Sequence, residues 1–269
     1  MLRSAQDSRA PRNGDVVLRI QGAAKVYASL SGSATALLPV TSEIRAGEFV
    51  GLVGPSGCGK TTLLKMCAGL IAPSAGHITF ADTGNSIAPG KFGFVFQAPA
   101  LLPWRTVLAN VALPADILGL DRGAALERAR ALLASVRLTG SEGKYPRELS
   151  GGMQQRAAIA RALLHDPDIL FMDEPFGALD AMTREDLNME LQRISQNQHK
   201  TVLFVTHDIE EAVLLSDRVF ALSAGPGRLV ETIDITLPRP RSLSVKGSPE
   251  FTQAVARIRA LLNREEALP

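Results

Sequence analysis

Short, continuous apolar runs recur along the chain, and each is followed by a longer stretch with apolar residues every three or four positions. The runs are EFVGLV at residues 48–53, DILFMD at 168–173 and TVLFV at 201–205. Runs of this length are typical of strands buried on both faces of a sheet. The stretches with helical spacing lie at residues 60–70, 153–164, 178–194 and 208–216. Buried strands that alternate with helices predict an α/β fold with a mostly parallel core sheet.

Three other segments have different patterns. Residues 15–27, DVVLRIQGAAKVY, alternate apolar and polar side chains, which favours antiparallel strands. Residues 124–138 have the spacing of an amphipathic helix and follow a proline-containing stretch, so we expect a helical subdomain inserted at about residues 98–155. Residues 248–267 predict a final helix, with Ser248 as its cap and a proline in its first turn.

The chain therefore divides into three expected parts. Residues 1–15 predict a disordered tail, residues 16–235 the main domain, and residues 236–269 a C-terminal linker and helix. Within the last part, LPRPR at residues 237–241 is expected to be a surface linker stiffened by its prolines.

Composition narrows the range of functions. The 269 residues carry a formal net charge of +2 and are 46% apolar, which allows a sizeable core and gives no strong positive charge for nucleic acid. No apolar run approaches the roughly 18 residues that a membrane-spanning helix needs. Cys58 and Cys67 stand nine positions apart on a predicted loop and its helix, which suits neither a metal site nor a disulfide. A reducing cytoplasm is the natural compartment.

Residues 54–62, GPSGCGKTT, join the first buried run to a helix and match the pattern G-x-x-x-x-G-K-[ST]. Glycines in such a loop let backbone amides turn toward phosphate groups. The lysine reaches the terminal phosphates, and the hydroxyl that follows it binds Mg²⁺. A glycine-rich turn without a ligand is the alternative. The predicted phosphate-binding residues are Gly54, Pro55, Ser56, Gly57, Cys58, Gly59, Lys60, Thr61 and Thr62.

Two acidic residues end the second buried run. Asp173 and Glu174 are adjacent, and side chains alternate along a strand, so the two carboxylates point in different directions. We expect Asp173 to bind Mg²⁺ through water and Glu174 to face the γ-phosphate. Because buried carboxylates are costly without partners, we favour this interpretation over a merely solvated strand end.

Two further polar residues follow predicted strands. His207 comes after residues 201–205, and Gln97 ends FGFVFQ at residues 92–97. The carboxyl ends of parallel strands meet at one edge of a sheet, where ligands bind. We expect His207 to contact the γ-phosphate and Gln97 to reach the metal or the attacking water; a structural histidine and a loop-capping glutamine are the alternatives. Tyr27 is a candidate for stacking on adenine, with a buried core tyrosine as the alternative.

LSGGMQQR, at residues 149–156, places a serine and two glycines directly ahead of a run of helix formers. Ser150 is a good N-cap for a helix over residues 153–164, and a bare helix N-terminus attracts anions. An ordinary capped surface helix explains the serine. It does not explain Gly151 and Gly152, because each glycine weakens a helix interior by up to about 1 kcal/mol.

Together these motifs resemble the ATP-binding subunits of ABC transporters. The phosphate loop is similar to the family's Walker A motif, ILFMDEP to its Walker B motif with the catalytic glutamate, and LSGGMQQR to its signature motif. Gln97, Asp180 and His207 match the Q-loop, D-loop and H-loop. The resemblance covers about residues 16–222. It implies a P-loop NTPase fold in which a mostly parallel core sheet carries an N-terminal antiparallel β subdomain and an inserted α-helical subdomain, with residues 16–235 as the ATPase domain.

The resemblance also implies a mechanism. In this family ATP is hydrolysed between two subunits of a head-to-tail dimer, and the signature of one subunit closes on the γ-phosphate held by the other. Glu174 would act as general base, His207 would orient water and phosphate, and Lys60 would stabilise developing charge. Thr61, Gln97 and Asp173 would bind Mg²⁺. The residues expected to reach the partner's ATP are Ser150, Gly151, Gly152, Gln154 and Asp180.

Residues 96–119, above all LLPWRTV, resemble the segment after the Q-loop in importers of nitrate, sulfonate, taurine and related compounds. In that family the segment forms a groove for a coupling helix of the membrane subunit; Trp104 either lines this groove or serves in packing. Ala98 departs from the acid that many importers carry there.

This resemblance implies a homodimer that works with transmembrane permease subunits and a periplasmic solute-binding protein, at the cytoplasmic face of the bacterial inner membrane. From the net charge of +2 we expect no nucleic-acid partner. The alternatives are an ABC ATPase without a transport role, and an unrelated P-loop kinase or nucleotide-binding module.

Overall fold

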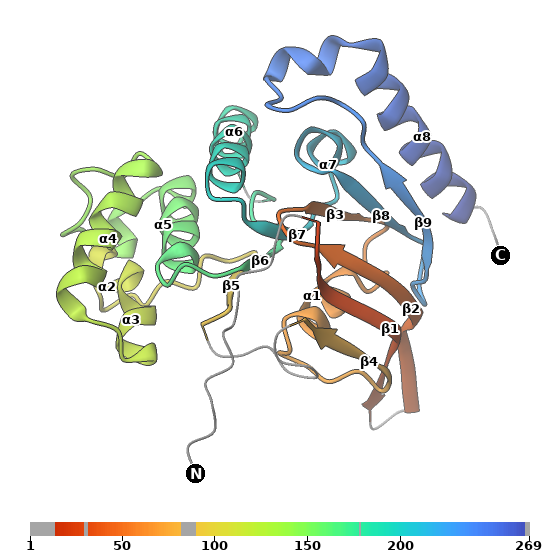
Figure 1. The fold of residues 1–269 in the computed structure, drawn as a ribbon, viewed down its shortest axis with the longest axis horizontal. Helices are drawn as coiled ribbons and strands as arrows, with labels where there is room; N and C mark the ends of the chain where they lie inside the picture. Colours follow the sequence, from red (N-terminus) through yellow and green to blue (C-terminus); the bar gives the residue numbers. More distant parts are fainter. Residues whose placement is uncertain (1–13, 30–31, 82–89, 178, 267–269) are drawn as a thin grey trace.

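The computed structural model describes residues 14–29, 32–81, 90–177 and 179–266. Its centre is a six-stranded sheet (Figure 1). In spatial order the strands are β5 (Phe92–Val95), β6 (Ile169–Asp173), β7 (Thr201–Val205), β3 (Phe49–Val53), β8 (Arg218–Leu222) and β9 (Leu229–Asp234). All neighbours pair in parallel except β8 and β9, which are antiparallel. The continuous apolar runs are strands buried on both faces, so the predicted α/β fold is confirmed.

A second sheet of three antiparallel strands lies beside the first. Its order is β2 (Gly32–Arg45), β1 (Val16–Ser29), β4 (Ala75–Phe80), which confirms the antiparallel strands predicted from residues 15–27. The tail predicted for residues 1–15 lies outside the described residues up to residue 13. Gly14 and Asp15, which were expected in the tail, exchange backbone hydrogen bonds with Ala46 of the main domain.

Helix α1 (Lys60–Cys67) contacts strands of both sheets. Its Leu63, Leu64 and Met66 are at most 2% exposed and belong to one core cluster with residues of β1, β2 and β3. Burial of large apolar side chains such as these contributes about 1.5–3 kcal/mol each. Because this packing joins the two sheets through α1, the loop before α1 is held from both sides.

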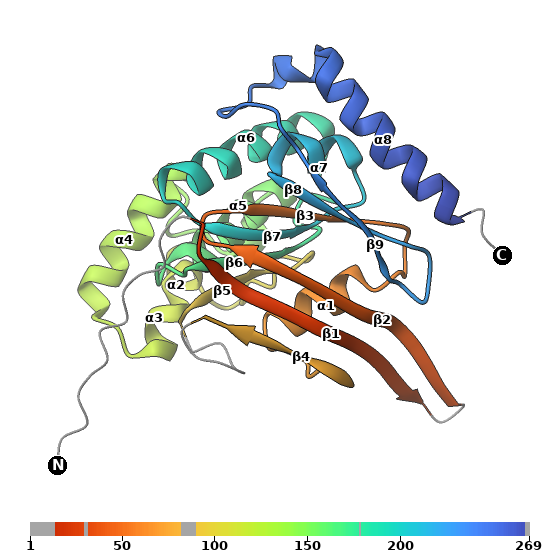
Figure 2. The ribbon, with the colours of Figure 1, turned by 45° about the vertical axis from the view of Figure 1, so that its right-hand side comes forward.

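Four helices form a separate group at the β5 edge of the central sheet, drawn yellow to green in Figures 1 and 2. They are α2 (Val107–Val111), α3 (Leu113–Leu118), α4 (Arg122–Ser135) and α5 (Gly151–Leu163). The helix predicted over residues 124–138 is confirmed as α4. The next helix begins at Gly151, two residues before the predicted start, and runs past residue 155, where we expected the helical insert to end.

Helices α6 (Ala181–Asn197), α7 (Ile209–Leu215) and α8 (Pro249–Glu266) lie on the other side of the central sheet from α1. The predicted final helix is confirmed as α8. The Phe251 amide donates a hydrogen bond of 3.2 Å to Ser248 Oγ at its start. Phe251, Val255 and Ile258 of α8 are buried against α7 and strands β8 and β9. The C-terminal part therefore packs on the main domain as an additional layer.

The prediction of a surface linker at residues 237–241 is wrong for the last residue. Pro238 and Pro240 are exposed, but Arg241 is only 2% exposed. Its guanidinium donates hydrogen bonds to backbone carbonyls at the end of α7. A long cationic side chain can be buried when every donor finds an acceptor, and the sequence pattern around two prolines does not show such acceptors.

We expect Gly227→Ala to destabilise the protein by about 2 kcal/mol or more. A Cβ atom at Gly227 would lie 1.7 Å from the carbonyl oxygen of Cys58, inside the phosphate loop. The backbone of Gly227 cannot move away freely, since it hydrogen-bonds Ala36 and Leu38 of β2. Thermal unfolding measures the effect. Gly143→Ala is the control, because its added Cβ would meet nothing within 4 Å; equal midpoints for both variants would contradict the prediction.

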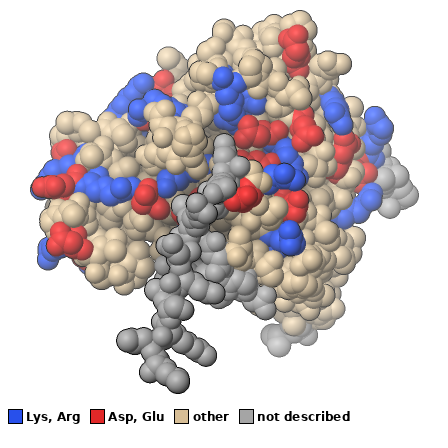
Figure 3. Space-filling view, in the orientation of Figure 1, with Lys and Arg blue, Asp and Glu red and all other residues tan. Residues whose placement is uncertain are grey.

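None of the helices in the described part of the chain is long and apolar enough to cross a bilayer. On the face shown in Figure 3, basic and acidic side chains are interspersed, and neither sign dominates.

Candidate functional site

The carboxyl ends of four neighbouring parallel strands carry the polar residues singled out in the sequence. Strand β3 leads into residues 54–62, β6 ends at Asp173, β7 is followed closely by His207, and β5 by Gln97. Because β5, β6, β7 and β3 are adjacent, the sheet brings these segments to one edge, as expected for a ligand site of a parallel sheet.

The phosphate loop ends at the bare N-terminus of α1. Gly59 is its N-cap with a φ of 95°, a conformation that suits glycine, and it offers no side chain to cap the first amide groups. These amides stay open to an anion, and the helix dipole favours negative charge there. The Lys60 ammonium donates hydrogen bonds of 2.8 Å to the carbonyls of Gly54 and of Pro55, so it lies inside the curve of the loop.

Thr61 and Asp173 meet directly beside this loop. The Thr61 hydroxyl donates a hydrogen bond of 2.6 Å to Asp173 Oδ1. Burial raises the pKa of Asp173, while the hydrogen bond from Thr61 and the charge of Lys65 oppose that shift. A hydroxyl and a carboxylate side by side are oxygen ligands of the kind that Mg²⁺ prefers, so the residues present fit this ion.

The Glu174 carboxylate lies next to both Gln97 and His207. Its Oε2 lies 3.5 Å from Gln97 Nε2, which donates to it, and 3.4 Å from His207 Nδ1. The backbone of Glu174 has a φ of 43°, which is uncommon for a residue other than glycine and is often found at functional sites. Strand β6 ends at Asp173, so this turn, rather than the alternation along a strand that we expected, directs the two adjacent carboxylates to different partners.

Tyr27 is not a core residue. Its side chain is 43% exposed, so the alternative of a buried tyrosine is wrong. Its hydroxyl lies 3.4 Å from Thr62 Oγ1 on α1. The ring therefore stands at the exit of the phosphate loop, where an aromatic face is available for stacking.

Ser150 caps α5 as predicted: its Oγ accepts a hydrogen bond of 3.3 Å from the Met153 amide. The two glycines after it differ. A Cβ at Gly151 would meet nothing within 4 Å, whereas one at Gly152 would lie 2.7 Å from Thr183 Cγ2 of α6. Close packing of α5 against α6 in the same chain therefore accounts for Gly152, and Gly151 faces open space.

Two other residues expected at the partner's ATP have roles within their own chain. Gln154 Nε2 donates hydrogen bonds to the carbonyls of Pro146 and Leu149, at 3.0 and 3.3 Å. Asp180 caps α6, accepting a hydrogen bond of 3.0 Å from the Thr183 amide, and this bond lowers the pKa of Asp180. Their contacts with ATP stay a prediction.

The sequence reasoning missed two residues of α5 that hold the Gln97 segment. Gln155 is 2% exposed and donates a hydrogen bond of 3.3 Å to the carbonyl of Phe96. Arg161 donates to the carbonyls of Pro99 and Ala100, at 2.8 and 2.7 Å. Neither residue stands out in the sequence, because Gln154 and Arg156 of the same helix are equally polar. Through the two missed residues, the helix that begins at Ser150 is tied to the loop that carries Gln97.

A mostly apolar cavity of about 610 Å³ lies between the central sheet and the helical group. Leu70, Phe94, Ile117 and His165 are among its lining residues. His165 Nε2 lies 2.9 Å from the Phe92 carbonyl, its Nδ1 is buried without a partner, and burial lowers its pKa. Trp104 is 71% exposed, so a packing role for it is wrong; it is not one of the described residues lining the cavity.

Both cysteines are buried and free, as expected from their spacing. Cys58 lies in the phosphate loop, with its sulfur 3.9 Å from the Lys60 ammonium.

Comparison with known proteins identifies the family and the fold. Residues 37–177 match the family model described as ABC transporter. The chain is 47% identical over 229 residues to the aliphatic sulfonates import ATP-binding protein SsuB of Bacillus licheniformis, covering 84% of this chain and 87% of that protein. A dimeric bacterial ABC transporter cassette superposes with a TM-score of 0.74 at 33% identity, covering 82% of this chain and 100% of that one.

A second structure of that cassette, in a post-hydrolysis state with ADP and Pi, superposes with a TM-score of 0.73 at 32% identity and the same coverage. The chain belongs to the ABC transporter family, as an ATP-binding subunit that hydrolyses ATP.

Proposed function

We propose that the chain is the ATP-hydrolysing subunit of an importer that takes up a small, anionic solute of the nitrate, sulfonate or taurine type. The observation that carries the hydrolytic part is the meeting of Glu174 with Gln97 and His207, next to the Thr61–Asp173 pair and the open start of α1. The importer part is supported by the sulfonate import proteins among the relatives.

In this proposal the phosphate loop and the N-terminus of α1 hold the phosphates of ATP, and Tyr27 stacks on the adenine. Thr61 and Asp173, with Gln97, would hold Mg²⁺, which would supply positive charge next to the phosphates. Lys60 supplies a fixed positive charge where negative charge develops during the reaction.

Glu174 is the proposed general base. Its carboxylate takes a proton from the attacking water, and His207 and Gln97 hold the water and the γ-phosphate in line. The 3.4 Å distance from Glu174 Oε2 to His207 Nδ1 lets one histidine orient both the base and the phosphate. The strained φ of Glu174 keeps its carboxylate in this place.

The proposed working form is a head-to-tail homodimer. Gly151 faces open space beside the capping serine at the N-terminus of α5, a suitable place for the γ-phosphate held by a partner subunit. The dimeric cassette among the structural relatives supports a dimer. Ser150, Gly151, Gly152, Gln154 and Asp180 would then reach the partner's ATP.

The cavity of about 610 Å³ is the proposed seat of a helix from the permease subunit. It is bounded by α3, α5 and β5, so a helix seated there would touch the elements that hold Gln97. The proposed assembly adds two permease subunits and a periplasmic solute-binding protein, and lies at the cytoplasmic face of the bacterial inner membrane. Residues 16–235 are the proposed ATPase domain, with a helical insert that begins at about residue 98 and includes α5.

Uptake of a labelled alkanesulfonate, taurine or nitrate by cells lacking this chain tests the transport role. We expect uptake of one of these anions to fall at least about tenfold, and to return with the wild-type chain but not with Glu174→Gln. Unchanged uptake of all three in the cells lacking the chain, while the purified wild-type chain hydrolyses ATP, would favour an ABC ATPase with another cargo or no transport role.

A further inference from the structure

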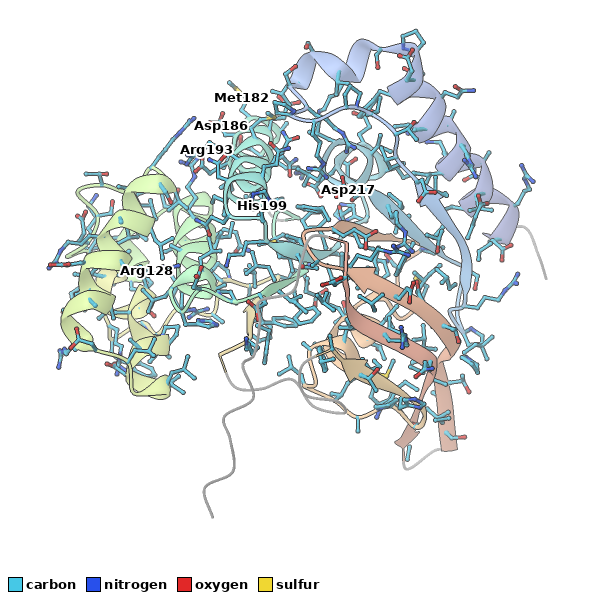
Figure 4. All side chains as sticks on the ribbon, in the orientation of Figure 1. Arg128, Met182, Asp186, Arg193, His199 and Asp217 are labelled. Atoms are coloured by element: carbon cyan, nitrogen blue, oxygen red, sulfur yellow. The ribbon has the colours of Figure 1, made fainter. Side chains whose placement is uncertain are left out.

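Residues 236–248 connect β9 to α8 and are called the strap here. In Figures 1 and 2 the strap runs from the end of β9 past α7 to the side of α6. Its first anchor is Arg239, whose guanidinium donates a hydrogen bond of 2.7 Å to Asp217 and another to the carbonyl of Leu215. Asp217, labelled in Figure 4, stands between the end of α7 and the start of β8.

The second anchor is the buried side chain of Arg241. Its Nη1 donates to the carbonyls of Val213, Leu214 and Ser216, at 2.9, 3.1 and 2.7 Å. These carbonyls end α7 and lack partners within the helix, and their partial negative charge favours a cation. Burial lowers the pKa of Arg241 to about 10, so the side chain keeps its charge at neutral pH.

The strap is bound to α6 by the backbone of the same residue. Gln192 of α6 is 2% exposed, and its side-chain amide pairs with Arg241 twice: Nε2 donates to the Arg241 carbonyl at 2.6 Å, and Oε1 accepts from its amide at 2.9 Å. Lys246 adds an ion pair of 2.8 Å to Glu185 of α6 and lies 4.0 Å from Glu210 of α7. Arg241 therefore holds α7 with its side chain and α6 with its backbone.

The two helices that the strap joins begin at the candidate site. The N-cap of α6 is Asp180, and the N-cap of α7 is Asp208, directly after His207. At these ends the helices meet through Arg184, whose Nη1 lies 3.7 Å from Asp208 Oδ2. This charge pair is long and partly exposed, so it contributes little by itself. Asn188 of α6 also hydrogen-bonds the buried Glu211 of α7.

We propose that Arg241 is a positioning residue for ATP hydrolysis: by joining α7 to α6 through the strap, it fixes His207 relative to the Asp180 end of α6. This rests on the proposed roles of His207 and Asp180. The strap acts at a distance from the reacting atoms, through helices that are rigid over their length. A small misplacement of a group that orients water lowers turnover strongly, while ATP binding through the phosphate loop is unaffected.

The test compares Arg241→Met and Gln192→Met with the full-length wild type, well below the unfolding midpoint of each variant. We expect kcat to fall about tenfold or more for Arg241→Met, with KM for ATP within about twofold, and less for Gln192→Met. Arg241→Lys keeps the charge and should recover part of kcat. The double variant Arg241→Met/Gln192→Met should lose less kcat than the two single losses combined predict, since both changes break the same strap.

Amide hydrogen exchange distinguishes positioning from stabilisation. We expect residues 179–184 and 206–211, at the site ends of α6 and α7, to exchange at least about tenfold faster in Arg241→Met. Arg257→Met is the matched control, because Arg257 joins α8 to Glu231 on β9 and does not touch the strap; it should leave kcat and both segments unchanged.

A lower unfolding midpoint with wild-type kcat and unchanged exchange at these two segments would overturn the proposal. The proposed function fails separately: if the wild type does not hydrolyse ATP, the roles of Glu174 and His207 are wrong, and the exchange measurement still decides whether the strap controls the site ends of the helices.

Discussion

Two inactive variants, Ser150→Arg and Glu174→Gln, are expected to hydrolyse ATP when mixed, although neither does so alone. In a head-to-tail dimer each site takes its base from one subunit and its signature from the other. A mixed dimer therefore has one site with both changes and one with neither. Since half the dimers are mixed and half of their sites are intact, activity should reach about a quarter of the wild-type value. Steady-state phosphate release measures it, with the proteins mixed before ATP is added.

A matched control uses the double variant Ser150→Arg/Glu174→Gln mixed with Ser150→Arg, a mixture in which every site lacks its signature serine. That mixture should stay inactive. The structure places Ser150 at the cap of α5 with Gly151 open beside it, so an arginine there blocks the helix end without entering the core. If the productive mixture forms dimers and stays inactive, Ser150 does not serve the ATP of a partner subunit.

Glu174→Gln alone is expected to lower kcat by about 10²- to 10⁴-fold while leaving the Kd for ATP nearly unchanged. The amide has nearly the same shape and can still contact Gln97 and His207, but it cannot take a proton from water. With ATP and Mg²⁺ the variant should accumulate as a dimer in size-exclusion chromatography, because the step that reopens the dimer is blocked.

The control for this variant is Glu231→Gln. This change removes a carboxylate on strand β9, at the sheet edge opposite β5, from an exposed ion pair with Arg257. Its kcat should match the wild type. Turnover of Glu174→Gln at more than about half the wild-type rate would mean that another group is the base, since a lost general base always costs far more than twofold.

Much of the fold could be predicted because its determinants are local. The buried strands are continuous apolar runs, and the helices have their own spacing and caps, as Ser150 and Ser248 show. The candidate site follows from the same information, since strands β3, β6, β7 and β5 run in parallel and carry their polar residues just past their carboxyl ends.

Other features depend on partners far away in the chain and could not be predicted. Arg241 follows two prolines and looks like a surface residue, yet its acceptors are carbonyls at the end of α7 and its backbone partner is Gln192. Gln155 and Arg161 are ordinary helix residues until the loop after β5 lies beside them. The close packing of Gly152 against Thr183 of α6 likewise leaves no trace in the sequence, where a ligand was the explanation for this glycine.

The sequence alone was thus sufficient for the fold class, the phosphate loop and the order of the motifs, because each is encoded in a few neighbouring residues. Which polar side chains are buried, and which helices the strap joins, depended on the three-dimensional packing. A hydrogen bond between residues far apart in the sequence leaves no periodic signal, because its two partners meet only after folding. Its strength also depends on the folded state, which excludes water from the contact.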